Sequence, residues 1–185
     1  LRFALQPAVQ HRHAVEFGGE VDEQGRHSLE VGARLLHLGH QLVEARLGGL
    51  YRLDTKLHLH NLDDGLGIAN GPCVNPVSGR LHVADSAERV IYSYAIAGDG
   101  SLSDKKVFLR TDAYDSGPDG CCFDSEGGLW TALVRTGALA RFDLQGRLTR
   151  KVGLPVAHPS ALCFGGPDMA DLFVTTISDS GRLSA

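Results

Sequence analysis

The sequence predicts an all-β fold of the β-propeller class, and two observations lead to it. After Gly48, short runs of β-forming residues alternate with turns of Gly, Asp, Asn and Ser, which is typical of a sandwich, a barrel or a propeller. Residues 78–83 (SGRLHV) also recur as residues 126–131 (EGGLWT), 48 positions later, and more loosely as residues 169–174 (MADLFV). A repeat of roughly 40 to 50 residues that holds about four strands indicates propeller blades.

The first 47 residues have a different pattern from the rest of the chain. Apolar residues follow one another there at intervals of seven and four, which is helical spacing: Leu29, Leu36, Val43 and Leu47. This spacing predicts an N-terminal amphipathic helix over residues 29–47. Residues 1–47 are therefore expected to be an atypical N-terminal segment, or else partial or degenerate blades. The first residue is Leu rather than Met, which suggests a fragment or a processed start.

Residues 48–185 are expected to be propeller blades in sequence order. Residues 49–64 resemble the outer strands of one blade, residues 70–118 make a second blade and residues 119–159 a third. Residues 160–185 make about half of another. The predicted strands are residues 49–53, 56–60, 79–84, 90–94, 106–109, 128–132, 138–142 and 172–175. An open array leaves unpaired strand edges, so part of the ring is expected to be missing, with the chain incomplete at its C-terminus.

Composition narrows the classes of function. The 185 residues are 43% hydrophobic with a net charge of −4, which fits one soluble domain and gives no basic surface for nucleic acid. No apolar run is long enough for a membrane span, so none is expected, and no signal peptide is visible in the given sequence. Each cysteine lies in an apolar run without a CxxC pair, and all four are expected to be buried free thiols: Cys73, Cys121, Cys122 and Cys163. Free thiols indicate a reducing cytoplasm.

Two short sequence motifs contain the candidate metal ligands, and both motifs are predicted to be loops. Residues 68–72 (IANGP) contain Asn70, and residues 116–120 (SGPDG) contain Asp119, 49 positions later. Loops one repeat apart both open toward the axis of a propeller, so the Asn70 amide and the Asp119 carboxylate could share one cation. The alternative is that both are ordinary turn residues, since Asn-Gly and Pro-Asp-Gly are common turn compositions. Asp85 and Asp124 are expected to be turn or blade-edge groups, and Trp130, Phe142 and Phe164 to lie in the core between blades.

Residues 48–178 resemble the senescence-marker-protein/gluconolactonase/regucalcin-like family. The matching words, in order, are GLYRLD (49–54), IANG (68–71), LHVADS (81–86), PDG (118–120), DSEGGLW (124–130), LP (154–155), CFGG (163–166) and LFVTT (172–176). The resemblance implies a six-bladed propeller that binds one divalent cation near its axis and hydrolyses sugar lactones. It also implies that a first-blade Glu, Asn70 and Asp119 hold the metal, and that Asp119 is the general base.

The chain departs from this family pattern in its N-terminal part. The family grips substrate with an Arg and an Asn in a word like Arg-Phe-Asn-Asp-Gly, which residues 16–26 (EFGGEVDEQGR) echo only faintly. Glu16 stands in the place of that Arg and Gly18 in the place of that Asn, so the substrate-binding residues stay unknown. Read as the first-blade Glu word instead, the same stretch offers Glu20 as a ligand. Glu16 and Glu20 are the candidates for the third metal ligand.

Three hypotheses for function follow from these observations. The first is metal-dependent hydrolysis of a sugar lactone to an aldonic acid, in the manner of a gluconolactonase, with Asn70 and Asp119 on the cation and Asp119 as base. The cation could be Ca²⁺, Zn²⁺, Mn²⁺ or Mg²⁺. The second is a catalytically inactive, truncated propeller that acts as a cation-binding or interaction module. The third is a fragment without independent function. In the first case the partner is a small-molecule lactone, and a cytoplasmic location is expected, without nucleic acid or membrane.

Overall fold

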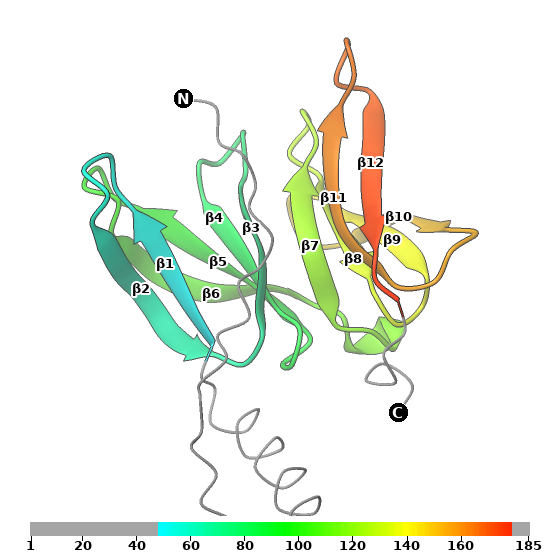
Figure 1. The fold of residues 1–185 in the computed structure, drawn as a ribbon, viewed down its shortest axis with the longest axis horizontal. Coiled ribbons are helices and arrows are strands. Elements are labelled where there is room, and N and C mark those ends of the chain that lie inside the picture. Colours follow the sequence, from blue (N-terminus) through cyan, green and yellow to red (C-terminus); the bar gives the residue numbers. More distant parts are fainter. Residues whose placement is uncertain (1–47, 179–185) are drawn as a thin grey trace, which may run out of the picture. The chain divides into compact units, whose positions relative to one another are not determined.

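The computed structural model describes residues 48–178, which all lie in one compact unit. Within these residues, twelve antiparallel strands form four sheets (Figure 1). The first sheet pairs β1 (Gly48–Leu53) with β2 (Leu59–Leu66), and the last pairs β11 (Pro159–Gly165) with β12 (Asp171–Thr176). These elements confirm the all-β prediction.

Each of the two middle sheets has four strands in sequence order. One holds β3 (Ala69–Val74), β4 (Leu81–Asp85), β5 (Val90–Ile96) and β6 (Leu102–Arg110). The other holds β7 (Pro118–Phe123), β8 (Leu129–Leu133), β9 (Ala138–Phe142) and β10 (Leu148–Gly153). A short 3₁₀ turn, Asp112–Tyr114, lies between the two sheets in the sequence. Four-stranded meanders of this kind are propeller blades.

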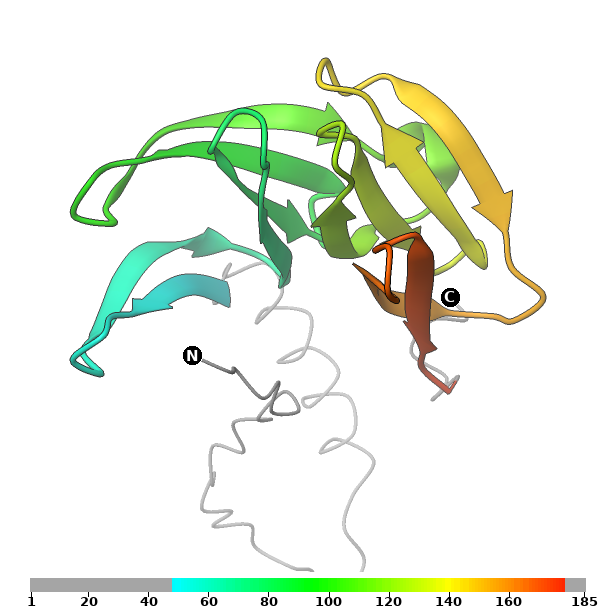
Figure 2. The same ribbon diagram turned by 90° about the horizontal axis from the view of Figure 1, so that it is seen from above.

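The first strands of the second, third and last sheets, β3, β7 and β11, lie side by side, as Figures 1 and 2 show. A Cβ on Gly71 of β3 would lie 2.5 Å from the amide nitrogen of Cys121 in β7. A Cβ on Gly120 of β7 would lie 2.5 Å from the Cα of Ala161 in β11. Glycine therefore allows backbone to meet backbone along β3, β7 and β11, which is the close approach expected of innermost strands.

The hydrophobic core is divided among the interfaces between successive sheets. One cluster joins Leu50 and Leu66 of the first sheet to Val83 and Tyr94 of the second. A second cluster spans the two four-stranded sheets and includes Phe142, and a third joins Trp130 to Leu162 and Phe164 of the last sheet. The rings of Trp130 and Phe164 meet edge to face with centroids 6.2 Å apart. The predicted inter-blade positions of Trp130, Phe142 and Phe164 are confirmed.

Asp124 organises the turn between β7 and β8, as expected of a turn residue. One carboxylate oxygen accepts the backbone N–H groups of Glu126 and Gly128, and the other accepts bonds from Trp130 Nε1 at 2.9 Å and Arg141 Nε at 2.6 Å. The Arg141 guanidinium holds the pKa of this carboxyl below its usual value against the effect of burial. Asp124 thus links the β7–β8 turn to Trp130 of β8 and Arg141 of β9 by hydrogen bonds.

Several sequence expectations differ from the structure. The predicted strand over residues 56–60 begins only at Leu59, because Asp54 Oδ1 accepts the N–H groups of Lys56 and His58 and closes a turn. Cys121 is buried and Cys73 and Cys122 are half-buried, but Cys163 is exposed. Its side chain lies on the face of β11 opposite Leu162, and no described sheet covers that face.

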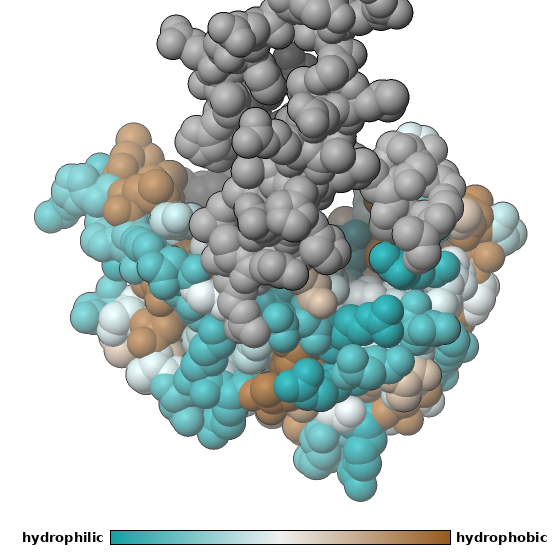
Figure 3. Space-filling model, turned by 90° about the horizontal axis from the view of Figure 1, so that it is seen from below, coloured by the Kyte–Doolittle hydropathy of each residue, from teal (hydrophilic) through white to brown (hydrophobic). Residues whose placement is uncertain are grey.

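Some expectations fall outside the described residues, among them the helix over residues 29–47 and the whole segment of residues 1–47. Within residues 48–178, no helix has the length and apolar character needed to cross a membrane. Over the visible part of the face in Figure 3, hydrophobic residues are scattered in small groups among hydrophilic ones.

Candidate cation site on the inner strands

Asn70 is the second residue of β3, not a loop residue as the sequence suggested. Its Nδ2 donates a hydrogen bond of 2.8 Å to Oγ of Ser86, which follows the end of β4. The Ser86 hydroxyl in turn donates to the carbonyl oxygen of Pro118 at 2.6 Å. Within residues 48–178, no hydrogen bond to Oδ1 of Asn70 is formed, so this oxygen is free to contact a ligand.

Asp119 occupies the matching second position of β7, again inside a strand. Burial raises the pKa of its carboxyl from 3.8 to about 6, and the N–H of Gly120 offsets only part of that effect. No Lys, Arg or His among residues 48–178 lies within ion-pair distance of the carboxylate. A half-buried carboxylate without a cationic partner is a group that a metal ion would stabilise.

The packing of two sheets brings Asn70 and Asp119 to neighbouring strands. Besides its approach to Cys121, a Cβ on Gly71 would lie 2.8 Å from the carbonyl oxygen of Asp119, so the residue after Asn70 lies against the Asp119 backbone. The buried carboxylate of Asp85 fixes the entry to β3, because it accepts the N–H groups of Gly67 at 2.8 Å and Ile68 at 3.1 Å. Asp85 is therefore a blade-edge group, as expected.

The described donors are one carboxylate and one amide oxygen. Among residues 48–178, no group of three or more His, Cys, Asp or Glu side chains could hold a metal ion. Glu16 and Glu20, the candidates for a third ligand, lie outside the described residues. Both described donors are oxygens, which suits a hard cation such as Ca²⁺, Mg²⁺ or Mn²⁺.

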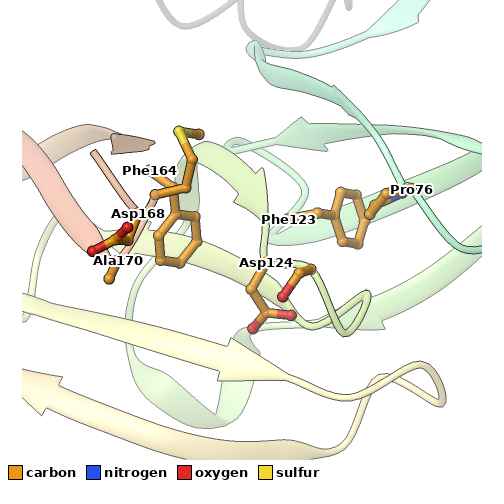
Figure 4. Close-up of a pocket in the computed structure, with 8 residues that line it drawn as sticks. Pro76, Phe123, Asp124, Phe164, Asp168 and Ala170 are labelled. Atoms are coloured by element: carbon orange, nitrogen blue, oxygen red, sulfur yellow. The ribbon is translucent and has the colours of Figure 1, made fainter. Parts of the chain in front are cut away.

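A cavity in the described region does not coincide with this pair. It has a volume of about 570 Å³ and lies near the other ends of the inner strands (Figure 4). Phe164 and Asp168 line one side of it and Phe123 and Pro76 another, with Asp124 between them. Among the residues that line it, Asp124 is already bonded to Arg141 and Trp130 and is therefore not free to act on a substrate.

The buried and half-buried cysteines of β3 and β7 offer no reactive thiolate. Burial raises the pKa of the Cys73 thiol, and raises the pKa of Cys121 and Cys122 to about 12. All three are therefore neutral thiols near pH 7, and a thiolate is the reactive form. All four cysteines are free, as the sequence predicted.

Ser86 is the site residue that sequence reasoning did not single out. It ends the word LHVADS (81–86), whose counterpart in the next repeat, residues 129–134, ends in Val134. A polar residue at a position where the next repeat has an apolar one could have indicated Ser86. Its partner Asn70 lies in the same sheet, and its partner Pro118 comes within reach only when the next sheet packs against it.

Comparison with known proteins gives consistent results. A family model described as "SMP-30/Gluconolactonase/LRE-like region" matches residues 16–178. A pentonolactonase of Haloferax volcanii is 31% identical over 139 residues, covering 75% of this chain and 48% of the relative. Regucalcin of Bos taurus is 29% identical, covering 87% of this chain and 54% of the relative.

A solved gluconolactonase from Xanthomonas campestris is similar in structure, with a TM-score of 0.60 at 28% identity, over 69% of this chain and 41% of that one. A calcium-binding regucalcin from Agrobacterium tumefaciens has a TM-score of 0.66 at 24% identity, over 75% of this chain and 48% of that one, which supports the propeller fold. The chain spans about half the length of the curated relatives it matches.

Proposed function

Because the chain belongs to the SMP-30/gluconolactonase/LRE-like family, we propose that it serves the hydrolysis of a sugar lactone to an aldonic acid with the aid of one divalent cation. The observation that carries the proposal is the placement of Asn70 and Asp119 on adjacent inner strands. Each offers an oxygen without a competing cationic partner in the described part of the chain. Relatives named as a pentonolactonase and a 6-deoxy-6-sulfogluconolactonase support the substrate class.

The proposed division of roles follows from the chemistry of the two side chains. A bound cation would polarise the lactone carbonyl and lower the pKa of a bound water. Asn70 supplies a neutral amide oxygen as a ligand, and the amide does not change its charge with pH. Asp119, with a pKa of about 6, is ionised at neutral pH and can accept the proton of the water that attacks the carbonyl. The ring oxygen then leaves and takes up a proton, which opens the lactone to the hydroxy acid.

The cation and the compartment are part of the same proposal. Two oxygen donors favour Ca²⁺, Mg²⁺ or Mn²⁺ over Zn²⁺, which binds nitrogen and sulfur ligands more readily. Four free cysteines support a reducing compartment, and we place the protein in the cytoplasm on that ground.

The test combines binding with turnover on the full chain. Calorimetric titration with each of the four cations should show binding that Asp119→Ala abolishes. Hydrolysis of gluconolactone, followed as acid release at constant pH, should fall at least 100-fold with the same variant and with excess chelator. Asp115→Asn is a suitable control, because this exposed carboxylate in the segment before β7 already has positive φ, which Asn tolerates. Full hydrolysis in excess chelator would refute the proposal.

A second candidate function is cation binding without turnover, as an inactive propeller module. It is favoured by one observation, the presence of only one carboxylate in the described donor set. Binding that depends on Asp119 together with no lactone hydrolysis would select this candidate.

A further inference from the structure

The hydroxyl of Ser86 lies between the two proposed ligand segments. It receives the bond from Nδ2 of Asn70 at 2.8 Å and donates to the carbonyl oxygen of Pro118 at 2.6 Å. A carbonyl oxygen can only accept, so the single hydroxyl proton of Ser86 is used on Pro118. Toward Asn70 the hydroxyl can therefore act only as an acceptor.

This directionality determines how the Asn70 amide faces. An amide has an NH₂ group on one side and an oxygen on the other, and only the NH₂ group can pair with an acceptor. Ser86 therefore fixes NH₂ toward itself and turns Oδ1 the other way. We propose that Ser86 is a positioning residue that presents Oδ1 of Asn70 to the divalent cation. The inference rests on the cation site of the proposed function.

The position of Ser86 is itself well determined. Its N–H donates to the carbonyl oxygen of Ile68 at 2.9 Å, two residues before Asn70. Its carbonyl oxygen lies where Gly117 approaches so closely that a Cβ there would be 2.5 Å away. Ser86 is thus held against the segments that lead into β3 and β7.

The repeat provides an internal comparison. In the next repeat Val134 stands where Ser86 stands, and the ligand position there holds Asp119 instead of Asn70. A carboxylate presents an oxygen on either side and needs no partner to orient it, whereas an amide does. The Ser86 hydroxyl thus occurs in the repeat whose proposed ligand, Asn70, has an NH₂ group on one side and an oxygen on the other.

The experiment is a double-mutant cycle on cation affinity. In the full chain, Ser86→Ala should weaken binding of Ca²⁺, Mn²⁺, Mg²⁺ or Zn²⁺, whichever the parent binds, by about tenfold or more, the usual effect of removing a ligand's orienting partner. In an Asn70→Asp background the same change should alter affinity less than about twofold, since the carboxylate needs no orientation. A purely structural role of Ser86 would give equal losses in both backgrounds, with parallel changes in thermal unfolding.

The outcomes separate this inference from the proposed function. Binding that depends on Asp119 but is unchanged by Ser86→Ala overturns the inference alone, as do equal losses in both backgrounds. Absence of binding by the parent with all four cations overturns both. Should Ser86→Ala not fold, nitrogen-15 spectra of the metal-free parent decide: Asn70 NH₂ protons protected from exchange support the inference, and freely exchanging ones refute it.

Discussion

At the scale of single residues, Asp119 carries a negative charge near pH 7 although its burial disfavours that charge. Its surroundings disfavour its charge, since burial raises its pKa from 3.8 to about 6. Near pH 7 the group is nevertheless ionised, so the fold holds a half-buried negative charge that no described cationic side chain compensates. A bound cation would remove this cost, which couples stability to the proposed ligand.

Replacing Asp119 with Asn should therefore stabilise the chain when no cation is present. The unfolded carboxyl loses its proton near pH 3.8 and the folded one near pH 6, so the stability of the parent falls as pH rises across this window and stays lower above it. Asp119→Asn removes that loss, worth about 1 kcal/mol at pH 7 after allowance for solvent screening of a half-buried group. Urea unfolding in chelator at pH 7 and below about pH 3 measures this difference.

The difference between variant and parent should vanish below about pH 3, where the Asp119 carboxyl is protonated in both the folded and the unfolded chain. Adding the cation should reverse the order at pH 7, because only the parent binds it. A variant less stable than the parent at pH 7 in chelator would show that Asp119 serves the fold through another contact.

The two proposed ligand residues could be predicted from the sequence, but the residue proposed to orient one of them could not. Asn70 and Asp119 lie in two short motifs that are 49 residues apart, which is about one repeat, so their equivalence can be recognised from the sequence alone. The bond from Asn70 to Ser86 spans 16 residues and that from Ser86 to Pro118 spans 32. The first depends on the pairing of β3 with β4, and the second on the packing of one sheet against the next, which no local pattern encodes.

At the scale of elements, the inner strands were the hardest to predict. Asn-Gly-Pro and Gly-Pro-Asp-Gly have the composition of turns, so residues 68–72 and 116–120 were expected to be loops. In the structure they run into β3 and β7, where Pro72 and Pro118 are tolerated because each strand pairs with a neighbour on one side only. Middle strands such as β9, with ordinary β-forming residues, matched the prediction, whereas the outermost strand β10 was not predicted.

The close approach of β3 and β7 should make Gly71 intolerant of any side chain. Gly71 has φ of +52°, and a Cβ would overlap backbone atoms of Cys121 and Asp119. Gly71→Ala should lower the free energy of unfolding by about 3 kcal/mol or more and weaken cation binding, because the strands must separate. Urea unfolding and calorimetric titration measure the two effects.

Gly79→Ala provides the matched control. Gly79 also has positive φ, +68°, but nothing lies within 4 Å of the added Cβ. This variant should lose only the cost of the left-handed backbone, about 1–2 kcal/mol, and keep the cation affinity of the parent. Equal losses for the two glycines would mean that backbone strain, and not strand contact, determines the outcome at Gly71.

At the scale of the whole described region, stability is distributed over interfaces between sheets. Each core cluster draws residues from two successive sheets, so no sheet buries its apolar faces alone. Polar contacts cross the same interfaces: Lys105 of β6 pairs with Asp63 of β2 at 2.6 Å, and Asp63 also accepts a bond from Tyr94 of β5. Coupling between nearest neighbours is what makes repeated units unfold together.

A substitution in the first sheet should therefore shift the unfolding transition of the last sheet as well. Leu66 is fully buried in the first interface, and Trp130, the single tryptophan of the chain, lies in the third. Leu66→Ala should lower the free energy of unfolding by about 2–5 kcal/mol through the cavity it leaves. The urea midpoint from Trp130 fluorescence should shift as far as the midpoint from far-ultraviolet circular dichroism.

Leu59→Ala on the same strand is the control, because Leu59 is 67% exposed and its loss should change stability by no more than about 0.5 kcal/mol. If Leu66→Ala shifted the circular dichroism midpoint but left the Trp130 transition in place, the first sheet would unfold independently of the last. The Asn70 and Asp119 strands lie between these two interfaces. Cooperative unfolding would thus mean that every sheet contributes to holding the proposed ligands together.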